Sequence, residues 1–115
     1  MIWGSFLSFQ AVAIQENINA VNTALLALEN LAVSFRTVDQ DCIDLKTIAE
    51  QINNDAVNDP DNSAISDRVK SIDSVVFQSC DETQKSAIIN SLKKASEKLK
   101  KKVSEIRTLI VELGN

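Results

Sequence analysis

Apolar residues recur every three or four positions along most of this chain, which is the spacing of one face of an α-helix. The first stripe has a period of about 3.5 residues and predicts a helix over roughly residues 11–36. Ala24 and Leu31 widen this stripe beyond a coiled-coil seam, so the helix suits a globular bundle. The stripe consists of Ile14, Ile18, Val21, Leu25, Leu28, Ala32 and Phe35.

Two shorter stripes follow and predict helices over about residues 40–57 and 63–79. The segment NDPDNS separates them, because Pro60 disfavours helical geometry for Asp59 and the neighbouring Asn, Asp and Ser residues favour turns. Asn62 or Ser63 is expected to cap the second of these helices. The two stripes are Cys42, Leu45, Ile48, Ala49, Ile52 and Ala56, then Ile65, Val69, Ile72, Val76 and Cys80.

A fourth stripe predicts a long helix that starts at a capping box formed by Asp81 and Gln84 and ends at Gly114. Short connections imply that consecutive helices are antiparallel neighbours. The sequence therefore predicts one all-α domain over residues 14–115, an up-down-up-down four-helix bundle with two long outer and two short inner helices. The long helices are expected to project past the short ones at one end. The fourth stripe contains Ile88, Leu92, Ala95, Leu99, Val103, Ile106, Ile110 and Leu113.

The first thirteen residues, MIWGSFLSFQAVA, carry no charge and have three interpretations. Ala11 and Ala13 have the small-x-small spacing of a signal cleavage site, which indicates a signal remnant, although no basic residue precedes the apolar run. Alternatively, Phe6 and Phe9 extend the first helix backwards and cover the open end of the bundle. A free membrane-facing segment is the third interpretation.

The chain lacks His and Tyr, and its net charge of −4 is unevenly distributed. Residues 1–80 carry four bases against eleven acids, whereas residues 81–115 carry eight bases against five acids. The basic segment contains no aromatic residue, so we expect no nucleic-acid partner. No nucleophile has a neighbouring base, and the commonest transition-metal ligand is missing. We therefore predict a protein that is not an enzyme and has no cofactor and no metal.

Cys42 and Cys80 are the two cysteines of the chain, at the start of the second helix and the end of the third. If these helices are antiparallel neighbours, both thiols lie at the same end of the bundle and on apolar faces. We favour a disulfide over two buried free thiols. A disulfide implies an oxidising compartment, and hence a secreted protein.

Two polar clusters each have a functional and a plainer interpretation. Residues 59–70 place acids at EF-hand spacing, but Ala64 replaces the required Gly and Lys70 the closing Glu, so a helix-capping turn is favoured. The lysines of the fourth helix either meet anionic lipid headgroups or, as we favour, form a solvated face that pairs with the acidic first and second helices. They are Lys93, Lys94, Lys98, Lys100, Lys101 and Lys102.

The interior is expected to be aliphatic, with Phe35 and Phe77 as its aromatic residues. Four broad apolar faces with many small residues either fill the core completely or leave an elongated cavity for an acyl chain. The candidate ligand-binding residues come from the stripes. They are Ile18, Val21, Leu25, Leu28, Phe35, Leu45, Ile52, Ile72, Val76, Leu92, Leu99, Val103 and Ile106.

The order of these patterns resembles the fungal hydrophobic surface-binding proteins, also called cell-wall galactomannoproteins. This resemblance implies a secreted, cell-wall-associated helical bundle that binds hydrophobic surfaces, or lipids such as fatty acids in an apolar interior. The segments that carry the resemblance are INAVNTALLALENLAVSF, IAEQINNDAVND, AISDRVKSIDSVV and AIINSLKKASEKLKKKVSEI.

Two function classes follow from these observations. The first is a secreted bundle that binds a fatty acid or another apolar lipid in its core, with contact to a membrane or hydrophobic surface as a related role. The alternative is a protein-protein interaction bundle, such as a secreted effector or assembly factor, with a filled core and a functional charged surface. We expect either a monomer or a homodimer in which the projecting ends of the long helices bury one another.

Overall fold

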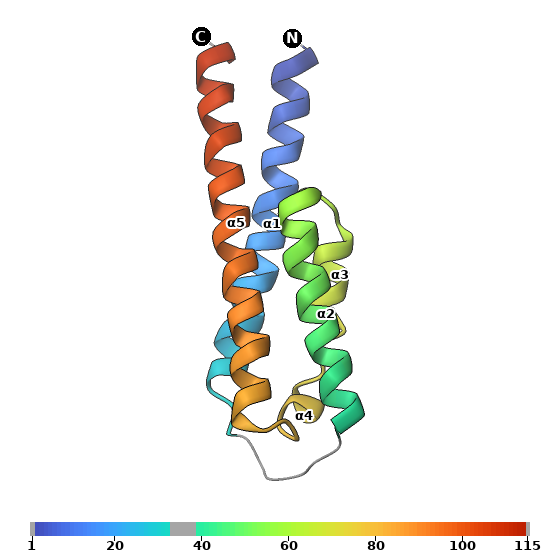
Figure 1. The fold of residues 1–115 in the computed structure, drawn as a ribbon. Helices are drawn as coiled ribbons and strands as arrows, with labels where there is room; N and C mark the ends of the chain where they lie inside the picture. Colours follow the sequence, from blue (N-terminus) through green and yellow to red (C-terminus); the bar gives the residue numbers. More distant parts are fainter. Residues whose placement is uncertain (1, 33–38, 115) are drawn as a thin grey trace.

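The computed structural model describes residues 2–32 and 39–114, and the side chains within residues 6–32 and 40–113. Every regular element in these ranges is a helix, which confirms the predicted all-α class (Figure 1). The helices are α1 (Ile2–Glu29), α2 (Asp39–Asn58), α3 (Ala64–Lys70), α4 (Ser74–Phe77) and α5 (Glu82–Gly114).

The two long helices, α1 and α5, lie side by side and antiparallel, and their contact is the most extensive in the molecule (Figure 1). Helix α5 also packs along α2, while α3 packs against both α1 and α2. Chain direction alternates from α1 to α2 to the α3–α4 segment to α5, which confirms the up-down-up-down order.

The expectation that all consecutive helices are neighbours is wrong for α1 and α2, and also for the α3–α4 segment and α5. Within the described residues α1 and α2 make no extensive contact, because α5 and α3 lie between them. Helix α5 can separate them because it presents different residues to each. Ser96 donates a hydrogen bond to Asn22 of α1 over 2.7 Å, and Lys98 donates one to Asn53 of α2 over 2.8 Å.

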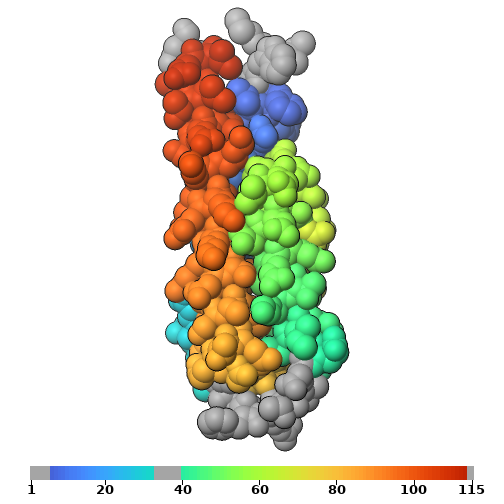
Figure 2. All heavy atoms as spheres, in the orientation of Figure 1, coloured from blue at the N-terminus to red at the C-terminus, as the bar shows by residue number. Residues whose placement is uncertain are grey.

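The molecule is elongated, with extents of 56 × 20 × 16 Å. Figures 1 and 2 show the reason: the first part of α1 and the last part of α5 extend beyond the end of the α2–α3 hairpin. This confirms the prediction that the long helices project past the short ones. The core lies where all the helices overlap.

Helix α1 begins and ends earlier than the predicted range of 11–36. Its buried stripe continues towards the N-terminus through Ala11 and the partly buried Leu7. The helix extends backwards from residue 11, as one interpretation of the first thirteen residues held, but Phe6 and Phe9 are 57% and 77% exposed and do not continue its buried stripe. At the other end, the Asn30 side chain donates to the carbonyl of Leu26 over 2.9 Å and closes the last turn.

The third predicted helix, over residues 63–79, is two helices in the structure. Ser71 donates both its amide and its hydroxyl to the carbonyl of Arg68, which ends α3. Asp73 is extended at its backbone, and its carboxylate accepts the amide of Val75 over 2.8 Å, which starts α4. The break turns Phe77 fully into the core, as predicted for this aromatic, and leaves Val76 partly buried.

The helix caps predicted for the starts of α3 and α5 are both present. Asp81 and Gln84 form the reciprocal capping box at α5: Gln84 donates its amide to the Asp81 carboxylate over 2.7 Å, and Asp81 donates its amide to the Gln84 side chain over 3.0 Å. At α3, the side chain of Asn62 accepts the amide of Ala64 over 3.0 Å, whereas Ser63 makes no side-chain cap.

Candidate functional site

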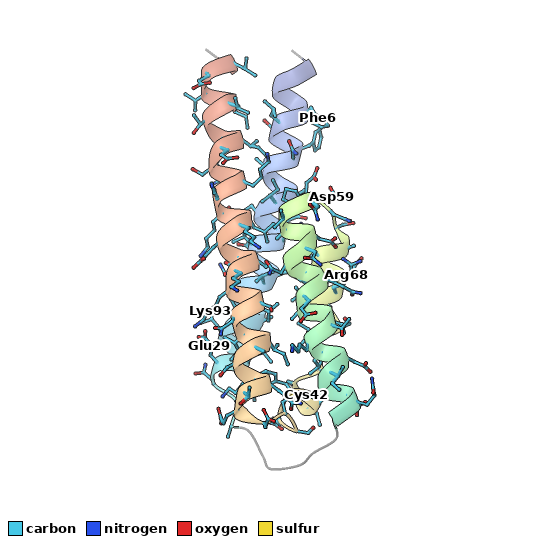
Figure 3. All side chains as sticks on the ribbon, in the orientation of Figure 1. Phe6, Glu29, Cys42, Asp59, Arg68 and Lys93 are labelled. Atoms are coloured by element: carbon cyan, nitrogen blue, oxygen red, sulfur yellow. A yellow bond between two sulfur atoms is a disulfide. The ribbon has the colours of Figure 1, made fainter. Side chains whose placement is uncertain are left out.

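Cys42 and Cys80 form a disulfide, which confirms the pairing expected from the helix order. Their Cα atoms are 5.6 Å apart, and both residues are buried in the core cluster. The bond joins the first turn of α2 to the chain between α4 and α5 at the end of the bundle opposite the projecting helices (Figure 3). The bond therefore joins the two ends of the segment that contains α2, α3 and α4 into a covalently closed loop.

Most of the candidate ligand-binding residues lie in the packed core. Ile72 and Val76 are only partly buried against it, and Phe35 lies outside the described residues. Leu28 and Ile72 also line a groove between α1 and α3, and Ile18 and Val103 line another between α1 and α5. The buried candidates are Ile18, Val21, Leu25, Leu28, Leu45, Ile52, Leu92, Leu99, Val103 and Ile106.

The groove between α1 and α3 has a volume of about 480 Å³ and mostly apolar walls. Its α1 wall has small side chains at Ala20, Ala24 and Ala27, one helical turn apart, so the groove is deep on that side. The opposite wall comes from α3 and the residues that follow it. The lining residues are Asn19, Ala20, Thr23, Ala24, Ala27, Leu28, Val69, Lys70, Ile72 and Ser74.

A buried asparagine holds α3 against α1 at one end of this groove. The Asn17 amide donates to the carbonyl of Pro60 over 2.9 Å and to that of Asn62 over 3.0 Å. Its oxygen accepts the hydroxyl of Ser66 over 2.6 Å, so the 1% exposed side chain has partners for both its amide nitrogen and its oxygen. Our sequence reasoning missed Asn17, although a polar residue between Ile14 and Ile18 in an apolar stripe is the signal for such a network.

The two basic residues of α3, Arg68 and Lys70, have different surroundings. Arg68, labelled in Figure 3, forms an ion pair with Asp55 of α2 that ties the two helices together, and neither residue lines the groove. Lys70 lines the groove and is exposed, so its ammonium can approach a bound anion while remaining in water. The groove therefore combines an apolar wall with a cation.

A second groove runs between α1 and α5 and is more polar. It has a volume of about 620 Å³, and a neighbouring groove of about 350 Å³ shares Gln15, Asn19 and Arg107 with it. Arg107 donates to the Gln15 side chain over 3.1 Å, and Gln15 donates to Asn19 over 3.0 Å. These bonds pair Gln15, Asn19 and Arg107, the three polar residues common to both grooves, with one another.

Two of the six lysines predicted to form the polar face of α5, Lys93 and Lys98, contact other helices. Lys93 forms an ion pair with Glu29 at 3.2 Å, as the predicted pairing with acidic helices requires. Lys98 instead meets the neutral Asn53, and Lys102 pairs with Glu105 of its own helix at 3.9 Å. Exposed pairs of this kind contribute little to stability.

The turn that follows α2 contains Asp59 and Asp61, two of the acids placed at EF-hand spacing. The protonated Asp59 carboxyl donates a hydrogen bond to the Asp61 carboxylate, which raises the pKa of Asp59, and desolvation and the neighbouring negative charge raise it further. Among the described residues, no group of three or more Cys, Asp or Glu side chains is placed to hold a metal ion.

None of the helices, as far as the structure describes them, is long and apolar enough to cross a membrane. The disulfide is typical of proteins that reside in oxidising compartments. Comparison of the chain with protein-family models, with curated proteins and with solved structures finds no match.

Proposed function

We propose that this protein is a secreted helical bundle that binds the acyl chain of a fatty acid or similar lipid in the groove between α1 and α3. The observation that carries the proposal is the groove itself: six apolar residues and one exposed lysine line a volume of about 480 Å³. Pockets for small molecules commonly measure about 300–1,000 Å³ and combine apolar walls with a few polar groups.

The shape of the groove favours a linear apolar ligand. The alanines of α1 leave room along the helix axis, because each lacks the side-chain atoms that would otherwise reach α3. Leu28 and Val69, which are 2% and 8% exposed, join the groove to the core, so a ligand there covers their remaining exposed atoms. Each buried methylene of the ligand contributes about 0.8 kcal/mol.

A ligand in this groove does not require the core to open. The buried candidates contact one another in the core cluster, and binding among them would displace packed side chains. The groove lies beside this cluster instead. Lys70 provides a counter-charge for a carboxylate, and the resemblance to hydrophobic surface-binding proteins also implies a lipid ligand.

Binding of a fluorescent fatty acid to delipidated protein tests the proposal. Ala27→Phe fills the groove from an exposed position, and Leu26→Phe adds the same ring to the neighbouring residue outside the groove lining. We expect Ala27→Phe to weaken binding at least tenfold and Leu26→Phe to leave it unchanged. Lys70→Gln should weaken binding of the fatty acid more than binding of the corresponding alcohol, with Lys94→Gln as the control.

The absence of saturable fatty-acid binding to the wild-type protein would refute the proposal. Equal effects of Ala27→Phe and Leu26→Phe would also refute it, because binding would then lie elsewhere. In either case the alternative function, a protein-interaction bundle, would be favoured. Loss of a pulled-down partner on charge reversal at Lys94, Lys98 and Lys101 would test that alternative.

A further inference from the structure

The projecting end of the bundle carries exposed apolar side chains that continue the two helix faces covered elsewhere by α2 and α3. We call residues 6–13 of α1 together with residues 107–113 of α5 the tip. Four of its side chains, Phe6, Phe9, Leu109 and Leu113, are 57%, 77%, 45% and 55% exposed, and we call these four the tip face. Figure 3 shows Phe6 beyond the end of the α2–α3 hairpin, on the same side of α1 as that hairpin.

On α1, helical spacing shows that the tip face continues the face that packs against α3. Phe6 and Phe9 are followed at helical spacing by Ala13, Asn17 and Ala20. Asn17 binds the turn before α3, and Ala20 lines the groove against α3. Phe6 and Phe9 therefore lie on the face of α1 that α3 covers further along the bundle.

On α5, the tip face likewise continues the helix face that packs against α2. Leu109 and Leu113 follow Lys98, Lys102 and Ile106 at spacings of three and four residues, and Lys98 bonds to Asn53 of α2. Exposure rises along this face from 2% at Ile106 to 55% at Leu113, as α2 ends. Within the described residues, α2 and α3 do not extend over the tip, so the tip consists of the α1–α5 layer alone.

We propose that the tip face is the contact surface for a second copy of this chain, paired about a twofold axis. Two tips packed face to face supply two helices to each other and complete a four-helix bundle over the tip length of about 12 Å. A twofold contact requires one self-complementary surface, and an apolar surface complements itself. The proposal is independent of lipid binding, because the tip face contributes no residue to the α1–α3 groove.

The charges of the tip favour a protein partner over a lipid surface. The α1 part of the tip contains no charged residue, and the α5 part contains one base and one acid, Arg107 and Glu112. Helices that bind anionic membranes carry several cations beside their apolar face, whereas the lysines of α5 end at Lys102, before the tip. Two such tips meet without net repulsion.

The exposed area sets the expected strength of the dimer. With about 150–200 Å² for a fully exposed large apolar side chain, the tip face presents roughly 400 Å² of apolar surface per copy. A standard stable interface buries about 800 Å² per partner, so the dimer lies at the small, weak end of specific contacts. We therefore expect a monomer–dimer equilibrium with a micromolar dissociation constant.

Sedimentation equilibrium of the full chain over about 1–300 µM brackets this range of dissociation constants. Phe9→Glu and Leu113→Glu each place like charges in the twofold contact from exposed positions, and should raise the dissociation constant at least tenfold. Leu26→Glu is the matched control, because Leu26 is 66% exposed on α1 outside the tip, and it should leave the dimer intact. Far-UV circular dichroism checks that each variant is folded.

A wild-type chain that remains monomeric throughout this range overturns the proposal. So does a dimer that dissociates equally with Leu26→Glu and with Phe9→Glu. Binding of a monomeric chain to phosphatidylcholine vesicles, lost in Phe9→Glu, would assign the tip face to a lipid surface instead. The groove variant Ala27→Phe should leave dimerisation unchanged, so failure of the lipid-binding proposal and failure of this one are distinguishable.

Discussion

Replacing Asn17 by Leu should remove the polar link between α1 and the start of α3. The substitution keeps the size of the side chain and deletes three hydrogen bonds, two donated to the backbone carbonyls of Pro60 and Asn62 and one accepted from Ser66. At a net value of about 1 kcal/mol for each bond, the loss is about 3 kcal/mol. For a domain of this size, that loss lowers the melting temperature by about 10 °C.

Urea denaturation followed by circular dichroism measures this change directly. Asn30→Leu is the matched control on the same helix, because Asn30 is exposed and makes one hydrogen bond to Leu26; it should cost about 0.5 kcal/mol. Ser66→Ala alone should cost about 1 kcal/mol, and less than that when Asn17 is already Leu. Equal stability of Asn17→Leu and the wild-type protein would refute the reasoning, since the freed carbonyls would then be satisfied without Asn17.

Three further outcomes are expected. Replacing Cys42 and Cys80 by Ala should lower the free energy of unfolding by about 4 kcal/mol in the loop-entropy model, measured by urea denaturation against the oxidised protein. Asp61→Asn should lower the pKa of Asp59 in an NMR titration, because it removes the carboxylate that raises this pKa. Since the pKa of Asp59 is raised in the folded state, protonation of Asp59 stabilises the fold, and this stabilisation is lost as the pH rises through the folded-state pKa of Asp59. Leu99→Ala should cost about 2–5 kcal/mol, because Leu99 is fully buried; a smaller cost would indicate that the core relaxes around the cavity.

Hydrophobic spacing was sufficient to predict the all-α class and the long helices, because the core is aliphatic and each stripe faces it, and the short connections predicted the alternating chain direction. The stripe of α5 remains buried from Ile88 to Ile106, and the capping box at Asp81 and Gln84 marks its start. The disulfide could be predicted because an antiparallel arrangement of the second and third helices places Cys42 and Cys80 at the same end of the bundle.

The break at Asp73 and the ends of α1 could not be predicted from hydrophobic spacing, because they depend on competition between alternative local structures. Asp73 can occupy a helix interior or start a new helix, and the second outcome is favoured because it turns Phe77 into the core. The diagonal placement of α1 and α2 likewise depends on α5 packing against both. The candidate groove was missed because most of its α1 wall is formed by small or polar residues, among them Ala20, Ala24 and Ala27, beside the large residues of the predicted stripe.

The extensive contact between α1 and α5 determines the order in which the chain can fold. These helices lie at opposite ends of the sequence, so the largest interface cannot form until α5 is available. The segment closed by Cys42 and Cys80 is complete before α5 begins, and its ends are only 38 residues apart. We therefore expect the α2–α4 unit to close early as a local hairpin and the docking of α1 onto α5 to follow as a slower, long-range step.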